Sequence, residues 1–249
     1  MRPIGFSTGA LAKGDFRRGL DLQRREGISA IELSALRDHE LPHLLAAIPT
    51  LDVPDVSYIS FHAPSKLVDT TETDVVQMLE RLPRRWPLVV HPDIVRTPSL
   101  WRRLGSRVCL ENMDNRKTTG RTVDELRALF TKLPEATFCL DVGHARQVDP
   151  TMASALLMLR EFGSRLVQLH VSDVGPNGEH LPVGVMAQLA FSRIAQQVPS
   201  TCPLIIESIV PPEKMNDELA AVAFAFGERI ANDQQRFNEW RSHWEHRTA

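Results

Sequence analysis

Short apolar runs that carry an acid or a histidine at or next to their last residue recur along the whole chain. The runs lie at residues 31–33, 59–62, 88–91, 108–112, 138–141, 166–170 and 204–207, after a first strand-like run at 4–8. They are rich in Val, Ile, Leu and Phe, which is typical of strands that are buried on both faces. The repetition indicates one architecture, in which successive strands each carry a polar side chain at the C-terminal end.

Helical segments alternate with these runs. Residues 122–125 read Thr-Val-Asp-Glu, a capping box that starts a helix, and Gly163 follows another helical segment as a stop signal. We expect strands at 4–8, 30–36, 58–63, 88–91, 107–112, 137–142, 166–171 and 203–208, and helices at 15–25, 38–48, 73–82, 99–104, 122–132, 150–162, 185–198 and 216–245. Residues 172–184 are expected to form a long polar loop.

The alternation predicts a single (β/α)8 TIM barrel domain over residues 1–249, with an amphipathic C-terminal helix. A strand and a helix recur about every 30 residues, and such barrels need about 250 residues. A doubly wound open sheet is the alternative, but no GxGxxG follows the first strand. The last helix carries Phe224, Phe226, Phe237, Trp240 and Trp244, which we expect to pack against the barrel wall.

Composition and charge limit the partners and the cellular compartment that we expect for this chain. A net charge of −2 and a pI near 6.5 do not favour nucleic acid or an anionic membrane as a partner. There is no apolar run of about 18 residues and no signal-peptide pattern, so we expect a cytoplasmic protein. Cys109, Cys139 and Cys202 lie in or next to strand-like runs without a CxxC motif, which indicates reduced, packed thiols.

The barrel interpretation directs attention to four strand ends. Active sites of such barrels lie at the C-terminal ends of the strands. Glu111, Asp141, His170 and Glu207 follow neighbouring strands there. Three converging carboxylates repel one another unless a cation lies between them, so we expect one divalent metal per chain, Mn, Mg, Co or Zn.

Further histidines open alternatives with two or three metals. His62 and His91 follow the third and fourth strands and could share Glu111 with a second metal. His144 and His180 could hold a third. Among other polar side chains near the mouth, we expect Glu32, Lys66 and Arg116 to bind substrate.

The strand-end motifs resemble those of the xylose-isomerase-like barrel superfamily. The similar stretches are 61–64 (FHAP), 90–92 (VHP), 110–112 (LEN), 140–144 (LDVGH), 169–173 (LHVSD), 180–184 (HLPVG) and 206–207 (IE). That superfamily includes sugar isomerases and epimerases, inosose dehydratases and isomerases, and zinc-dependent apurinic/apyrimidinic endonucleases of family 2.

The resemblance implies two sets of roles. In the epimerase branch the four strand-end residues bind one metal, Glu111 and Glu207 are also the catalytic acid/base pair, and His144 contacts substrate. In the endonuclease branch His62, His91 and Glu111 match one zinc site, the four-residue set a second, and His144 with His180 a third. The endonuclease pattern has an aspartate two residues before the position of His180, where this chain has Gly178. A third zinc would therefore need Glu179 or Asp173 as a ligand instead.

Three functions follow. The first is an isomerase or epimerase of a carbohydrate-like small molecule, phosphorylated or not, acting through a metal-stabilised enediolate. The second is a di- or trinuclear zinc hydrolase of phosphodiesters or phosphomonoesters. The third is a non-catalytic barrel that binds a ligand. We favour the first; nucleic acid as a partner is the less favoured alternative, and a homodimer is an expectation for such barrels.

Overall fold

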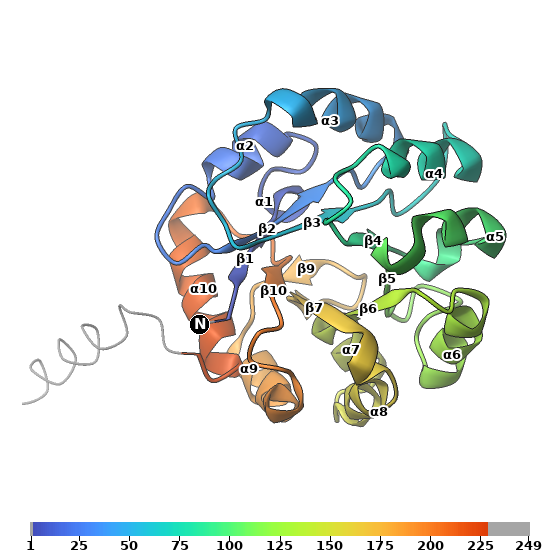
Figure 1. The fold of residues 1–249 in the computed structure, drawn as a ribbon. Coiled ribbons are helices and arrows are strands. Elements are labelled where there is room, and N and C mark those ends of the chain that lie inside the picture. Colours follow the sequence, from blue (N-terminus) through green and yellow to red (C-terminus); the bar gives the residue numbers. More distant parts are fainter. Residues whose placement is uncertain (1, 229–249) are drawn as a thin grey trace, which may run out of the picture.

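The computed structural model describes residues 2–228 and shows the expected barrel. Within this part of the chain, eight parallel strands close on themselves in the order β1-β10-β7-β6-β5-β4-β3-β2 (Figure 1). The strands of the barrel are β1 (Ile4–Ser7), β2 (Ala30–Ser34), β3 (Tyr58–His62), β4 (Leu88–Val90), β5 (Val108–Glu111), β6 (Thr137–Asp141), β7 (Leu166–Val171) and β10 (Leu204–Ile206). The (β/α)8 prediction is therefore confirmed.

Helices surround the barrel, with α3 to α6 and α8 to α10 forming an outer ring (Figure 1). The helices are α1 (Thr8–Ala12), α2 (Phe16–Asp21), α3 (Leu41–Ala47), α4 (Glu72–Glu80), α5 (Pro98–Trp101), α6 (Val123–Lys132), α7 (Val142–Val148), α8 (Ala153–Phe162), α9 (Val185–Ser192) and α10 (Met215–Ala225). The expected cap of α6 is present, because the Thr122 hydroxyl accepts from the Glu125 amide at 3.2 Å. None of these described helices is long and apolar enough to cross a membrane.

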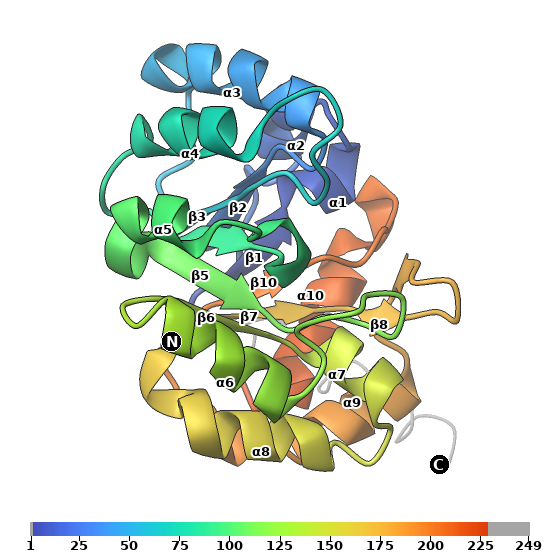
Figure 2. The same ribbon diagram turned by 90° about the vertical axis from the view of Figure 1, so that its right-hand side faces the viewer.

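The strands deliver their C-terminal ends to one side of the barrel, next to α1, α7 and a short hairpin (Figure 2). Parallel pairing sets the register, with Asp141 beside His170 and Glu32 beside Ser60. Inside the barrel, Val89, Cys109 and Cys139 form a small cluster of their own. All three cysteines of the chain are buried and unbridged, as expected for reduced, packed thiols.

Several predicted elements differ in detail. The helix expected at 15–25 is the shorter α2, which Asp15 caps by accepting from the Arg18 amide. The helix α1 was not predicted, and it begins at Thr8, where the first strand was expected to end. A helix at 142–148, α7, was not predicted. The helix expected at 99–104 is α5 followed by a 3-10 segment (Arg102–Arg107). The loop expected at 172–184 contains the antiparallel hairpin of β8 (Asp173–Val174) and β9 (His180–Leu181).

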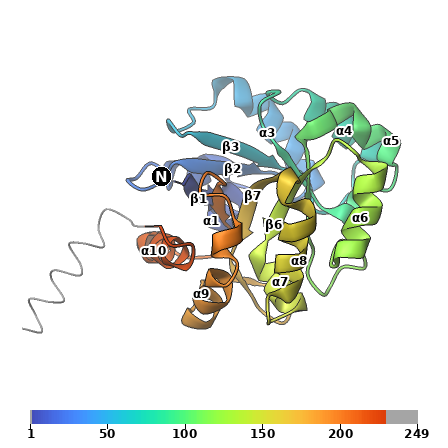
Figure 3. The same ribbon diagram turned by 60° about the horizontal axis from the view of Figure 1, so that its bottom comes forward.

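The C-terminal helix is present as α10, which lies beside α9 on the outside of the barrel (Figure 3). It ends at Ala225, so the predicted extension to residue 245 lies beyond the described residues, as do Phe237, Trp240 and Trp244. Of the five aromatic residues that were expected to pack against the barrel wall, the structure describes two. Phe226 is buried, and Phe224 is exposed.

Asp38 fastens two loops at the mouth of the barrel. Its Oδ2 accepts from the amides of Val68, Asp69 and Thr70 at 2.6, 2.7 and 3.0 Å. Burial would raise the pKa of this carboxyl, but the hydrogen bonds outweigh it and lower the pKa from 3.8 to about 2. The ionised carboxylate therefore holds the loop after β3 against the loop after β2.

Replacing Asp38 with Asn should lower the free energy of unfolding by about 1–3 kcal/mol at pH 7, because a neutral amide oxygen accepts more weakly from the three N–H donors and the NH2 would face the His39 amide, which now donates to Oδ1. The folded-state pKa is depressed, so the wild-type advantage exists at neutral pH. It should shrink as the pH falls from about 4 to about 2, where the carboxylate takes up a proton. Urea unfolding at several pH values measures this. Asp69→Asn, at an exposed side chain of the same loop, should change stability little, and equal effects of both variants would contradict the anchoring role.

Candidate metal centre

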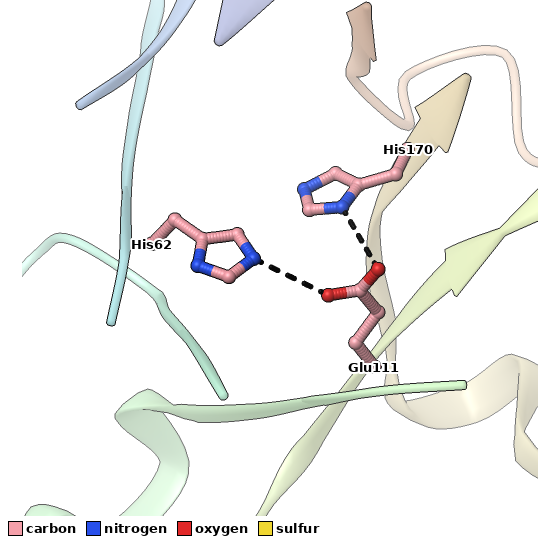
Figure 4. A group of neighbouring side chains, drawn as sticks. All are labelled: His62, Glu111 and His170. Carbon is pink, nitrogen blue, oxygen red and sulfur yellow. Dashed lines mark ion pairs between the residues drawn. The ribbon is translucent and has the colours of Figure 1, made fainter. Parts of the chain in front are cut away.

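Glu111 lies at the centre of the strand ends and contacts four histidines. It is the last residue of β5 and has no solvent exposure. Its Oε2 lies 3.4 Å from His62 Nε2 and 3.3 Å from His91 Nε2. Its Oε1 lies 3.2 Å from His144 Nδ1 and 3.3 Å from His170 Nδ1. Figure 4 shows two of these histidines approaching the carboxylate from opposite sides.

The four residues expected to form one metal site come together. Glu111, Asp141, His170 and Glu207 offer ligand atoms that all lie within 4.8 Å of one another. His170 Nδ1 lies 3.4 Å from Glu207 Oε2, and Glu207 follows directly after β10. His62 and His170 also group with Glu111. The centre therefore extends continuously from β3 to β10.

The donor atoms of this centre fit a cation. Both oxygens of Glu111, Oδ2 of Asp141 and Nδ1 of His170 are buried and form no hydrogen bond with any described residue. Buried carboxylates without hydrogen bonds are costly unless a positive charge lies beside them. Imidazole and carboxylate together suit Zn, Mn or Co. These four residues could therefore hold one divalent metal, and His62 and His91 could hold another on the Oε2 side of Glu111.

The pKa values reflect the same crowding of charge. Burial would raise the pKa of Glu111, but the surrounding histidines, His170 and His91 foremost, hold it well below its usual range. Burial would lower the pKa of His144, but Asp141 and Glu111 raise it. Burial lowers the pKa of His91 and keeps that imidazole neutral, as a metal ligand must be.

Asp141 has a second task, which explains why α7 begins immediately after β6. Its Oδ1 accepts from the His144 amide at 2.7 Å and so caps α7, while Oδ2 faces the centre. Asn112 clamps the Asp141 backbone with two hydrogen bonds of 2.8 Å. The backbone carbonyl of Asn112 also accepts from His144 Nδ1 at 3.0 Å. Nε2 is therefore the nitrogen of His144 that is available to a ligand. Asn112 was not predicted as a site residue, although it follows Glu111 directly and belongs to the LEN stretch at 110–112.

Glu32 was expected to bind substrate at the mouth, but the structure places it one layer deeper. β2 continues to Ser34, so Glu32 points inward two residues below the strand end, and it is fully buried. Its Oε2 lies 3.1 Å from His170 Nε2 and accepts from Gln168 Nε2 at 2.8 Å. Glu32 therefore orients His170 so that Nδ1 faces Glu111. His62 is oriented similarly, because its Nδ1 donates to the Ala63 carbonyl at 2.7 Å.

A cavity of about 210 Å³ opens above Glu111. Its lining includes His62, His91, His144, His180 and Glu207 from the predicted set, together with Leu36, Ser65, Met113, Asp114, Arg116, Lys117 and Gly178. Arg116 thus lies where a substrate-binding residue was expected. Lys66 is exposed and is not part of this lining.

A third metal beside His144 and His180 was expected to need Asp173 or Glu179 as a ligand, and neither carboxylate faces these histidines. Asp173 pairs with Arg146, and Glu179 is exposed and accepts from Asn177. His180 Nδ1 instead lies 2.9 Å from the Ser172 hydroxyl and 3.6 Å from Glu207 Oε2. Glu111 and Asp141 lie beside Nδ1 of His144, and Asp114 Oδ2 lies 3.9 Å from its Nε2.

Solved structures with a similar fold include two proteins with different names. Endonuclease IV from Thermus thermophilus aligns with a TM-score of 0.58 and 20% identity, over 89% of this chain and 98% of that chain. A protein from Anabaena variabilis, named as a candidate sugar phosphate isomerase/epimerase, aligns with a TM-score of 0.57 and 12% identity, over 88% of both chains. No protein-family model and no curated protein matches the chain. These similarities support the (β/α)8 barrel fold, and the two names show that proteins of this fold are assigned different reactions.

Replacing Glu32 with Gln should weaken binding of Zn2+ or Mn2+ by about 10–100-fold, because His170 would lose the negative partner that orients it. Competition with a chromophoric chelator measures the affinity. Glu125→Gln, on the outer helix α6, should bind metal as the wild type does. An unchanged affinity in a folded Glu32→Gln variant would contradict the orienting role.

Proposed function

We propose that this chain is a two-metal hydrolase of phosphoesters. One observation carries the proposal: the two oxygens of Glu111 face separate sets of ligands. His62 and His91 lie beside Oε2, and His170, which groups with Asp141 and Glu207, lies beside Oε1. A carboxylate in this position is suited to bridge two cations. When bound, the metal pair would clamp the phosphoryl oxygens and lower the pKa of the attacking water.

The first task of the protein groups is to keep the ligands in place. The Ala63 carbonyl fixes His62, Glu32 fixes His170, and the two hydrogen bonds of Asn112 fix Asp141. Because these supports are buried, the site needs little reorganisation when a substrate enters.

The second task is proton transfer. In hydrolysis a bond forms between the water oxygen and phosphorus, the bond from phosphorus to the ester oxygen breaks, and the departing oxygen takes up a proton. Glu207 lines the cavity and is suited to accept the proton of the water. His144 presents Nε2 to the cavity and is suited to donate a proton to the departing oxygen.

A sugar or polyol isomerase or epimerase is the second candidate. The observation that favours it is the four-residue set on the Oε1 side, which alone could hold one metal. Glu111 and Glu207 would then be the acid/base pair, and Glu207 has access to the cavity. This reaction leaves His62 and His91 without a catalytic task. Their convergence on Oε2 is the reason for placing the hydrolase first.

Metal content together with a His91→Ala variant separates the two candidates. We expect two metals per chain in protein purified without chelator, and one in His91→Ala, because that side of Glu111 loses a ligand. Hydrolysis of a general phosphomonoester or phosphodiester substrate should fall by at least about 100-fold in the variant. Elemental analysis and a phosphate-release assay measure both effects.

The matched control is His43→Ala, at an exposed position on α3, which should keep both metals and full activity. A wild type with one metal per chain, whose isomerase activity on ketoses survives His91→Ala, would replace the hydrolase with the second candidate.

A further inference from the structure

Two consecutive cations stand at the mouth of the cavity. Arg116 and Lys117 belong to the loop after β5, and both line the cavity above Glu111. Among the described residues, they are the only Lys or Arg side chains in that lining. Each is held in place by a neighbouring aspartate, and each aspartate in turn lies beside a histidine of the metal centre.

Arg116 is fixed by contacts on two sides. Its Nε donates to Asp114 Oδ2 at 2.8 Å, a second nitrogen donates to the same oxygen at 2.5 Å, and a third donates to the Asn177 carbonyl at 3.0 Å. The guanidinium also lies against Gly178, where a Cβ would come within 1.9 Å of its Cζ. These contacts use three of the five N–H groups of the guanidinium, so two remain for a ligand.

Lys117 has a parallel arrangement on the other side of Glu111. Its Nζ donates to Asp93 Oδ2 at 2.6 Å, and Asp93 Oδ1 lies 4.0 Å from His91 Nδ1. Asp114 connects Arg116 to His144 in the same way, at 3.9 Å. The two cations are therefore positioned relative to the centre by short chains of side chains from both flanks. A solvated surface pair would lack this support.

We infer that Arg116 and Lys117 bind the phosphate of a small phosphomonoester. This deepens the proposed function and rests on it. A dianionic terminal phosphate lying between the metal centre and the two cations would have its outward oxygens met by a planar guanidinium fork and an ammonium. The cavity of about 210 Å³ suits a small molecule. The net charge of −2 provides no general attraction for a nucleic-acid strand.

Titration of inorganic phosphate into the full-length protein tests this inference. It should be done with chelator-treated protein and with protein reloaded with Zn2+, by calorimetry or 31P NMR. Arg116→Gln should weaken phosphate binding at least about tenfold in both forms, and Lys117→Gln several-fold, because each removes a charge-assisted hydrogen bond. Arg121→Gln is the matched control: Arg121 lies in the same loop but pairs with Glu125 outside the cavity, and phosphate affinity should not change.

Arg116→Lys covers the case in which Arg116→Gln does not fold because Asp114 is left buried and unpaired. The lysine variant keeps the charge and loses the fork, so phosphate should bind about threefold or more weakly. Wild-type affinity in a folded Arg116→Gln or Arg116→Lys variant would overturn the inference. A short single-stranded oligonucleotide that displaces phosphate at lower concentration than a sugar phosphate does would overturn the small-molecule assignment.

The outcome is separable from that of the hydrolase proposal. Phosphate binding that depends on Arg116 in chelator-treated protein supports the anion site even where His91→Ala leaves activity intact. Loss of hydrolysis in His91→Ala with no effect of Arg116 on phosphate would support the metal pair and reject the anion site.

Discussion

The burial of one carboxylate constrains the rest of this structure. Glu111 is removed from water in the middle of the barrel mouth, where an isolated charge would be too costly to keep. Four imidazoles from different elements offset that cost, two at each oxygen. They can meet only because the barrel closes and brings the ends of β3, β4, β6 and β7 around β5. The electrostatics of the centre and the topology of the sheet therefore depend on each other.

A second layer of polar groups makes this arrangement rigid. Glu32, Gln168 and Ser60 form a buried network below His170, and Asn112 holds the backbone from which Asp141 projects. Such networks are stable only when almost every member has a partner. Glu32 keeps one oxygen without a partner, Oε1, and both oxygens of Glu111, Oδ2 of Asp141 and Nδ1 of His170 also lack hydrogen bonds within the described residues. These atoms lie at the centre and directly below it, where a bound cation would offset the cost of their burial.

Much of this could be predicted from the sequence, for a physical reason. Parallel strands that are buried on both faces read as apolar runs, and an acid or histidine that ends such a run must lie at the common edge. Glu111, Asp141, His170 and Glu207 followed from that rule. The rule does not predict how far below the barrel mouth a polar side chain lies. Glu32 lies within its strand, and because β2 continues to Ser34, Glu32 is placed below the mouth. It also does not reveal that Asp141 caps a helix, which is why α7 was missed, or that Lys66 would lie outside the cavity lining.

Arg116 and Gly178 have a consequence for how this site could change. Gly178 has a φ of +78°, and the guanidinium fills the space that a side chain would occupy. A side chain at position 178 would therefore displace the guanidinium, which is the flexible end of Arg116, from its contacts with Asp114 and the Asn177 carbonyl. An acid placed there would leave the buried Asp114 without its present cation. The carboxylate that a three-metal arrangement requires and the present position of Arg116 thus compete for the same space.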